Sequence, residues 1–250
     1  MAGLAGLSWF QAGVWQNSIT LFSHALEVTP ENAVAHINLG AALEQAGSAD
    51  AALPHYIEAL RIDPGRAQGH HNLANILDSQ GRFPEALPHF EEAIRLRPRA
   101  ALPRRSLGQA LVAQGRFAEG LAQYADAMKL APGDPHPYYL TGVARLQQGQ
   151  LAPAIAAFRE ALRRNPNHAK ALDRLARVLA AAPDPAVRDG VEAVRLATRA
   201  AVRTGWRQPA VLDTLAMACA EAGRFDDAMK HLEKAIELLA GSGEIGRAHV

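Results

Sequence analysis

The chain has 250 residues, of which 49% are apolar and 20% charged, so it can form a packed core and is not an intrinsically disordered segment. Its formal net charge is +1, and its single cysteine, Cys219, excludes an internal disulfide framework. No apolar run reaches the roughly 18 to 20 residues that a membrane-spanning helix needs. Alanine is abundant and aromatic residues make up only 6%, a mixture that favours helix.

Residues 1–32 open the chain with an apolar stretch. The first 16 residues contain no lysine or arginine, so they lack the basic start of a secretory signal. The segment is predicted to be an incomplete leading copy of the unit that repeats after it. It keeps five of that unit's landmarks, namely Gly6, Gly13, Phe22, Ala25 and Pro30.

A period of 34 residues governs the chain from residue 33 onward. Five kinds of landmark keep this spacing: prolines (Pro30, Pro64, Pro98, Pro132, Pro166), glycines (Gly47, Gly81, Gly115, Gly149), small residues (Ala52, Ala86, Gly120, Ala154), rings (Tyr56, Phe90, Tyr124, Phe158) and alanines (Ala59, Ala93, Ala127, Ala161). A fixed period of this length is typical of repeat proteins.

Each period is predicted to hold two helices. In the first period a helix over about 33–46 ends at Gly47, because glycine tolerates a left-handed cap, and a second over about 49–62 ends before Pro64. Small residues such as Gly40 and Ala52 let the helices approach, and Tyr56 fills the space beside them. One pair cannot bury its apolar face alone, so neighbouring pairs are expected to stack.

The predicted repeats cover most of the chain. They span residues 33–66, 67–100, 101–134, 135–168, 169–208 and 209–240, and the fifth has an insertion in its turn around Pro183-Asp184-Pro185. Residues 241–250 are predicted to be an unstructured tail. Within it, residues 244–250 match one translation of a common sequencing adapter, so they are expected to be an artefact.

This pattern resembles the tetratricopeptide repeat family. The resemblance implies an all-α fold, a right-handed superhelical solenoid of antiparallel helix pairs. It also implies a protein–protein interaction scaffold that binds a peptide or extended segment in its concave groove, which the first helix of each repeat lines.

Amide side chains occupy part of this expected groove. The sixth place of the repeat holds Asn38 and Asn72, and Asn75 follows one turn later. They resemble the asparagine ladder of O-linked N-acetylglucosamine transferases, which grips a peptide backbone; an amide can donate and accept hydrogen bonds at once. The alternative is that Asn-Leu-Gly is simply the consensus sequence of the first helix.

A basic set is the second feature of the expected groove. Residues 95–207 hold 19 Lys and Arg against 8 Asp and Glu, whereas residues 1–60 hold five acids and no base. The set resembles the carboxylate clamp of chaperone co-factors, which implies a partner with an acidic segment, although Leu140 stands where the clamp has an asparagine. The bases could instead be an anion-attracting patch or solvated surface residues. The predicted residues are Arg105, Gln109, Lys170, Arg174 and Arg177.

Other chemistries find little support in the sequence. The ten histidines show no i, i+4 ligand spacing, so no metal site is predicted, and Cys219 is predicted to be a packing residue. No nucleophile motif or phosphate-binding loop is present, so neither an enzyme, a cofactor nor a small-molecule substrate is expected. Nucleic acid is not expected either, because the arginines of the second helices lack an aromatic-lined track. Those arginines are Arg159, Arg163, Arg164 and Arg199.

An alternative concerns a larger parent protein. The segment around Trp15, Ser18, Leu21 and Phe22 resembles the junction that follows the last membrane helix of bacterial lipid-linked-sugar glycosyltransferases with a tetratricopeptide tail. The resemblance implies a substrate-presenting tail tethered to a membrane, with the catalytic part outside this chain. The compartment is not predicted.

The last predicted helix has apolar residues at helical spacing, Met229, Leu232, Ile236 and Leu239, and no polar cap after it. Self-association through this helix is therefore expected.

Overall fold

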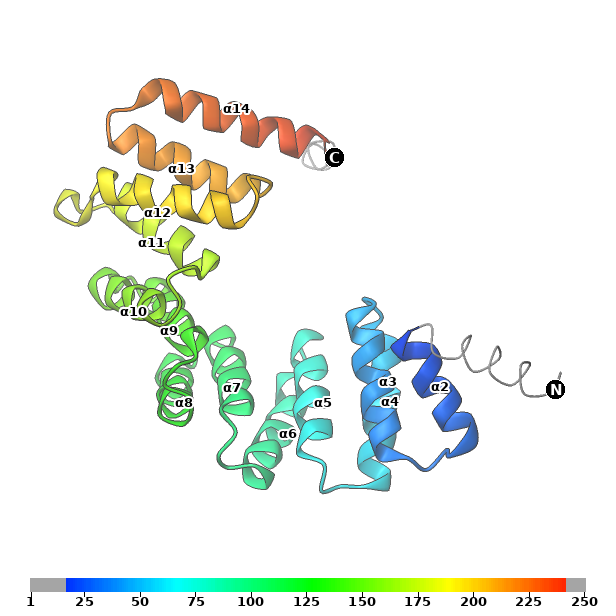
Figure 1. Cartoon of the computed structure of the whole chain (residues 1–250). Coiled ribbons are helices and arrows are strands. Elements are labelled where there is room, and N and C mark those ends of the chain that lie inside the picture. Colours follow the sequence, from blue (N-terminus) through cyan, green and yellow to red (C-terminus); the bar gives the residue numbers. More distant parts are fainter. Residues whose placement is uncertain (1–16, 242–250) are drawn as a thin grey trace. The chain divides into compact units, whose positions relative to one another are not determined.

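The computed structural model describes residues 17–241, and these residues form an all-helical fold without a strand, as predicted. Figure 1 shows the helices in chain order. They are α2 (Ser18–Val28), α3 (Ala33–Gln45), α4 (Ala49–Ile62), α5 (Ala67–Ser79), α6 (Phe83–Leu96), α7 (Ala101–Ala113), α8 (Phe117–Leu130), α9 (Pro135–Gln147), α10 (Leu151–Arg164), α11 (Ala169–Ala181), the short 3-10 helix η1 (Pro185–Val187), α12 (Gly190–Arg203), α13 (Pro209–Glu221) and α14 (Phe225–Gly241). Trp15 and the predicted artefact at residues 244–250 lie outside the described residues.

The chain divides into two compact units, one up to Gln123 and one from Tyr124, and the division falls within α8. In the first unit, α3 pairs with α4 and α5 with α6, and each pair contacts the next. In the second unit, α9 pairs with α10, α11 with α12, and α13 with α14. In both units the contacts join helices that are neighbours or next neighbours along the chain, as in repeat proteins.

Local signals end and begin the helices. The Asn32 side chain accepts a hydrogen bond from the Ala35 amide and caps the start of α3. Five glycines that follow first helices have positive φ, between 73° and 80°, which is the left-handed conformation that lets the chain turn into the second helix. These are Gly47, Gly81, Gly115, Gly149 and Gly223.

Ring side chains packed against small residues form the centre of the α3–α4 and α9–α10 pairs. Tyr56 and Phe158 are completely buried, and they lie beside Gly40 and Gly142 on the preceding first helices. A Cβ atom at Gly40 would lie 2.7 Å from Cε1 of Tyr56, and one at Gly142 would lie 2.5 Å from Cε1 of Phe158. The glycines are therefore required by the close approach of the rings.

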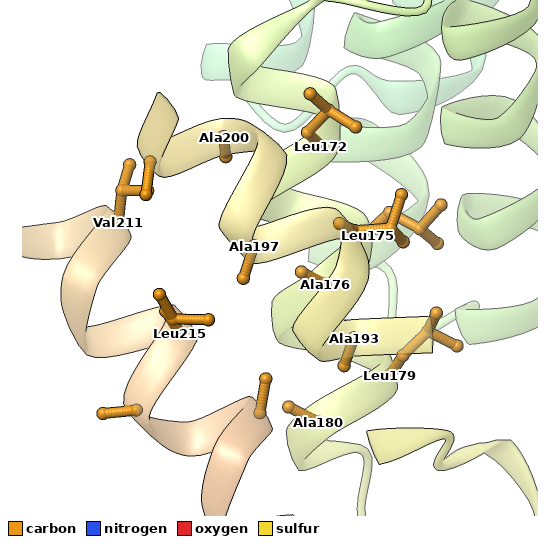
Figure 2. Close-up of a cluster of buried hydrophobic side chains, with 14 of the residues drawn as sticks. Leu172, Leu175, Ala176, Leu179, Ala180, Ala193, Ala197, Ala200, Val211 and Leu215 are labelled. Atoms are coloured by element: carbon orange, nitrogen blue, oxygen red, sulfur yellow. The ribbon is translucent and has the colours of Figure 1, made fainter. Parts of the chain in front are cut away.

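Leucine and alanine fill the core of the second unit between α11, α12 and α13. Figure 2 shows residues of this buried cluster, with leucines and alanines from α11, alanines from α12 and Leu215 from α13. Cys219 of α13 is also buried there, as predicted for a packing residue. The inserted turn keeps α12 in place, because the Asp189 amide donates to the Leu179 carbonyl at 2.9 Å.

The last described helix presents an apolar stripe to solvent. Phe225, Met229 and Ile236 are 67%, 57% and 58% exposed. Leu232 is 37% exposed, although the ring at the same place of the repeat is buried in the earlier pairs. In those pairs the following repeat covers this face.

The glycine–ring contact predicts that Gly142→Ala lowers stability. Alanine favours a helix interior over glycine by about 0.5–1 kcal/mol, but overpacking a core costs about 1–3 kcal/mol, and the buried Phe158 ring cannot swing into solvent. We expect a net loss of about 1 kcal/mol or more in urea denaturation. Gly133→Ala is the control, since a Cβ there meets nothing within 4 Å. Equal stability of the two variants would contradict this packing.

Candidate functional site

The first helices of the first unit adjoin one another, α3 against α5 and α5 against α7 (Figure 1). This arrangement brings the sixth places of three repeats into one row, in which Asn38, Asn72 and Ser106 are each half-buried. We call the surface formed by this row and its neighbours the first-helix face. The residues at the second position of the same repeats lie at its outer edge and are all exposed: Val34, Gln68 and Leu102.

Two depressions lie on the first-helix face, at the junctions between repeats. One has a volume of about 270 Å³ and is lined by Val34, Asn38 and Arg66 among others. The second has a volume of about 280 Å³ and is lined by residues including His71, Asn72, Leu102 and Pro103. Gln68 and Arg97 border both. Each depression therefore combines an asparagine amide with an arginine and an exposed aliphatic side chain.

A hydrogen-bond network fixes the amides around His71. The Asn75 side chain donates to Nε2 of His71 at 3.2 Å, so this nitrogen carries the lone pair, and the Ser106 hydroxyl contacts it at 3.0 Å. Burial lowers the pKa of His71, and the positive charge of Arg105 lowers it further, whereas a hydrogen bond with the Asn72 side chain opposes this shift. His71 is therefore a neutral acceptor, and the amides around it are held in fixed orientations.

Tyr56 links the network to the core. Its hydroxyl donates to the Glu44 carboxylate and also meets the Asn72 side chain. Burial, followed by the contact with Glu44, raises the pKa of Tyr56 well above its ordinary value. The core ring of the first repeat thus orients an amide of the second.

The predicted basic residues lie in both units. Arg105 and Gln109 lie on α7 in the first unit, Arg105 half-buried and Gln109 exposed. Lys170, Arg174 and Arg177 lie on α11 in the second unit, where the side chains of Lys170 and Arg174 are exposed. The structure therefore places these residues on the first helices of two separate units.

Arg177 is engaged in the packing of α11 on α13. Its guanidinium donates to Asp213 Oδ2 at 3.0 Å, and its Nη2 and Nε donate to the hydroxyl of the buried Thr214 at 2.8 and 3.2 Å. Two helices are joined by these bonds. Its contribution to partner binding stays a prediction.

The sequence analysis missed two histidine pairs in the first unit. Nδ1 of His36 lies 3.1 Å from Nδ1 of His55, and Nδ1 of His70 lies 2.9 Å from Nδ1 of His89. Burial and the partner ring lower the pKa of both His55 and His89. The sequence does indicate these pairs, because His36 and His55 recur 34 residues later as His70 and His89. Ligand spacing of one turn on a single helix does not reveal them, since each pair joins two helices.

Residues 17–241 contain no cluster of three or more His, Cys, Asp or Glu side chains that could hold a metal ion. No helix in the same residues has both the length and the apolar character needed to cross a bilayer.

The antiparallel helix pairs, the ring packed on a small residue and the 34-residue period define a helical-repeat protein of the interaction-scaffold class. Sequence models described as tetratricopeptide repeat match residues 31–99, 71–135, 135–168 and 210–238, so the chain belongs to the tetratricopeptide repeat family. A comparison with curated proteins finds no match.

Solved structures with the same fold include three repeat proteins. One, described as the functional characterization of Pseudomonas aeruginosa pilF, has 24% identity and a TM-score of 0.69 and covers 80% of this chain and 88% of that chain. The Cut9–Hcn1 hetero-tetramer of APC/C has 18% identity and a TM-score of 0.72, with 93% and 46% covered. YrrB, described as a TPR protein with an unusual peptide-binding site, has 21% identity and a TM-score of 0.50, with 87% and 91% covered.

The bonds of Arg177 predict unequal effects of three alanine substitutions on α11. Arg177→Ala removes an ion pair and three hydrogen bonds between helices, so we expect a loss of about 1 kcal/mol in the free energy of unfolding. Lys170→Ala and Arg174→Ala alter solvated side chains and are expected to stay within about 0.5 kcal/mol of the parent. Urea denaturation of the three variants measures the difference, and equal losses would show that Arg177 has no special structural role.

Proposed function

We propose that the chain is an interaction scaffold whose first-helix face binds an extended peptide of a partner protein. The observation that carries this proposal is that Asn38 and Asn72 each line one of the two depressions of the first unit, with the Asn75 amide hydrogen-bonded to His71 nearby. An extended backbone offers N–H and C=O groups in alternation, and an amide side chain satisfies either. The depressions then take side chains of the peptide.

The composition of the depressions indicates which side chains fit. The wall formed by Leu102, Pro103, Ala67 and Ala100 favours an aliphatic or aromatic side chain, because covering it removes apolar surface from water. Arg97 at the border favours a carboxylate nearby. The preferred peptide therefore combines apolar and acidic residues.

In the second unit the exposed Lys170 and Arg174 provide an additional, independent attraction for acidic segments. Solvent-exposed ion pairs contribute only about 0.2–1 kcal/mol each, so these bases accelerate encounter more than they hold the partner. Micromolar binding needs about −8 kcal/mol, which requires the apolar contacts and ordered hydrogen bonds of the first-helix face as well. The likeness to YrrB, whose description names a peptide-binding site, supports peptide binding by this fold.

Selection from a random 12-residue peptide library on the intact chain tests the proposal. Selected peptides, measured by fluorescence anisotropy, should bind the Asn38→Ala/Asn72→Ala variant about tenfold or more weakly, because two hydrogen bonds are lost at about 0.5–1.5 kcal/mol each. Asn167→Ala, in an exposed loop of the second unit, is the matched control and should bind normally.

Two results would overturn the proposal. The library could yield no specific peptide, or the selected peptides could bind the double asparagine variant as tightly as the parent. A charge reversal, Lys170→Glu/Arg174→Glu, separates the contribution of the second unit. It should slow association with acidic peptides at low salt, whereas reversal of the exposed Arg203 and Arg207 on the second-helix side should not.

We further propose that the stripe on α14 mediates self-association, with α14 of a second copy as its occupant. The exposed Phe225, Met229 and Ile236 occupy places that the next repeat covers elsewhere in the chain, so the face is shaped for a helix. Burying it against the same stripe of another copy removes both from water.

This predicts a concentration-dependent sedimentation coefficient that Met229→Lys/Ile236→Lys abolishes. Val191→Lys/Val202→Lys is the control, because both valines are 79% and 58% exposed on α12 but lie outside the stripe. A parent chain that sediments as a monomer at all concentrations, or equal loss in the control, would exclude α14 as the contact.

The membrane-tethered alternative rests on the resemblance of the segment around Trp15. That residue lies outside the described residues, and the alternative stays a prediction.

A further inference from the structure

The two histidine pairs have a common geometry that the peptide-binding proposal does not use. In each pair one ring comes from the first helix of a repeat and the other from the second helix, 19 residues later. The ring centroids are 5.3 Å apart in the first pair and 5.1 Å in the second, while the Nδ1 atoms are 3.1 and 2.9 Å apart. The centroids are therefore farther apart than the nitrogens by about two ring radii, so the rings meet with nitrogen facing nitrogen.

A backbone carbonyl sets the tautomer of the first-helix histidine. Nε2 of His36 lies 3.1 Å from the Pro30 carbonyl oxygen, and Nε2 of His70 lies 3.0 Å from that of Pro64. A carbonyl only accepts, so Nε2 carries the hydrogen and Nδ1 of the neutral ring carries a lone pair. The Nδ1 hydrogen of the second-helix histidine then occupies the space between the rings.

We propose that each pair, His36 with His55 and His70 with His89, binds one divalent transition-metal ion between its two Nδ1 atoms. Metal–nitrogen bonds of about 2.0–2.1 Å place two neighbouring ligand nitrogens about 2.9–3.4 Å apart. The Nδ1 atoms already have this separation, so binding needs rotation of two half-buried rings and no shift of the helices.

The proton balance of binding is simple. The second-helix histidine releases its Nδ1 hydrogen to solvent and takes one from solvent at Nε2, so both rings stay neutral and both offer Nδ1 lone pairs to the ion. No net proton is released. The carbonyl bond at Nε2 of the first-helix ring already selects the tautomer whose Nδ1 offers a lone pair, and a bond of this kind to the second ring nitrogen is the usual support of a metal-ligating histidine.

Other histidines and repeats provide a contrast. His136 and His168 have centroids 5.1 Å apart, but their rings are perpendicular. Nδ1 of His136 meets Asp134 at 2.8 Å, and Nδ1 of His168 accepts from the Ala171 amide. Neither nitrogen is directed at the other ring. In the third predicted repeat the two places hold Arg104 and Gln123, so the pair is confined to the first two repeats.

The ligand number defines the kind of site. Each pair supplies two imidazoles. Among the described residues no group of three or more possible ligand side chains occurs, so water fills the remaining coordination positions. The ion is therefore exchangeable rather than structural. Imidazole favours Zn²⁺, Ni²⁺ and Cu²⁺ over Mg²⁺ and Ca²⁺.

Calorimetric titration of the intact chain with Zn²⁺ tests the proposal. We expect two equivalents per chain, one after His55→Gln and none at these sites after His55→Gln/His89→Gln, with a loss of at least about tenfold in affinity at each altered pair. Glutamine is chosen because Gln123 occupies the same place in the third repeat. Circular dichroism checks that the variants fold.

The control variant is His24→Gln/His136→Gln, which removes two histidines outside the pairs and should keep both equivalents. Histidine ¹⁵N NMR should show Zn²⁺ on Nδ1 of the four paired rings. Unchanged stoichiometry in the double glutamine variant, loss of both equivalents in the control, or coordination through Nε2 would overturn the proposal. Failure of peptide binding would leave it unaffected, since the pairs and the amide row are different residues.

Discussion

The contact of an aromatic ring with a small residue is the constraint on which the rest of this structure depends. In the α3–α4 and α9–α10 pairs, the ring of the second helix fills the space that glycine leaves on the first helix, as Tyr56 does at Gly40 and Phe158 at Gly142. This contact sets the distance between paired helices, and so determines which side chains remain at the surface. The hydroxyl of Tyr56 extends the effect, because it reaches both Glu44 and the Asn72 amide of the following repeat.

Much of this arrangement could be predicted from the sequence because the decisive contacts recur at a constant spacing. The all-helical fold, the family and the burial of Cys219 are confirmed, since each depends on which residue types return after 34 positions. Asn38 and Asn72 are both half-buried on first helices that contact each other, because the period returns each asparagine to the sixth place of its repeat. That they bind a peptide remains a proposal, because the period places side chains but does not reveal their ligand.

The contacts of Arg177 and of the histidine pairs could not be predicted in this way. Each joins two different positions of the repeat, whereas the 34-residue period relates only equivalent positions. Arg177 of α11 contacts Asp213 of α13, and the insertion at Pro183–Pro185 changes the spacing between these helices along the chain, so the contact could not be read from equivalent residues in other repeats. The histidine pairs join two helices, and a search along one helix misses them. The boundary between the two compact units falls within α8, where the amino-acid composition does not change in a way that would predict it.

The short range of the helix contacts along the chain affects how this protein folds and unfolds. Within each unit, the helices that the structure describes make their main contacts with neighbours and next neighbours in the chain. Little loop-closure entropy therefore opposes any single contact, and folding is expected to be fast for a protein of this length. No one region has to act as the nucleus; any repeat can start the process and recruit the next. Under tension, the described helix pairs are expected to open one after another rather than all at once, because each pair is held mainly by its neighbours.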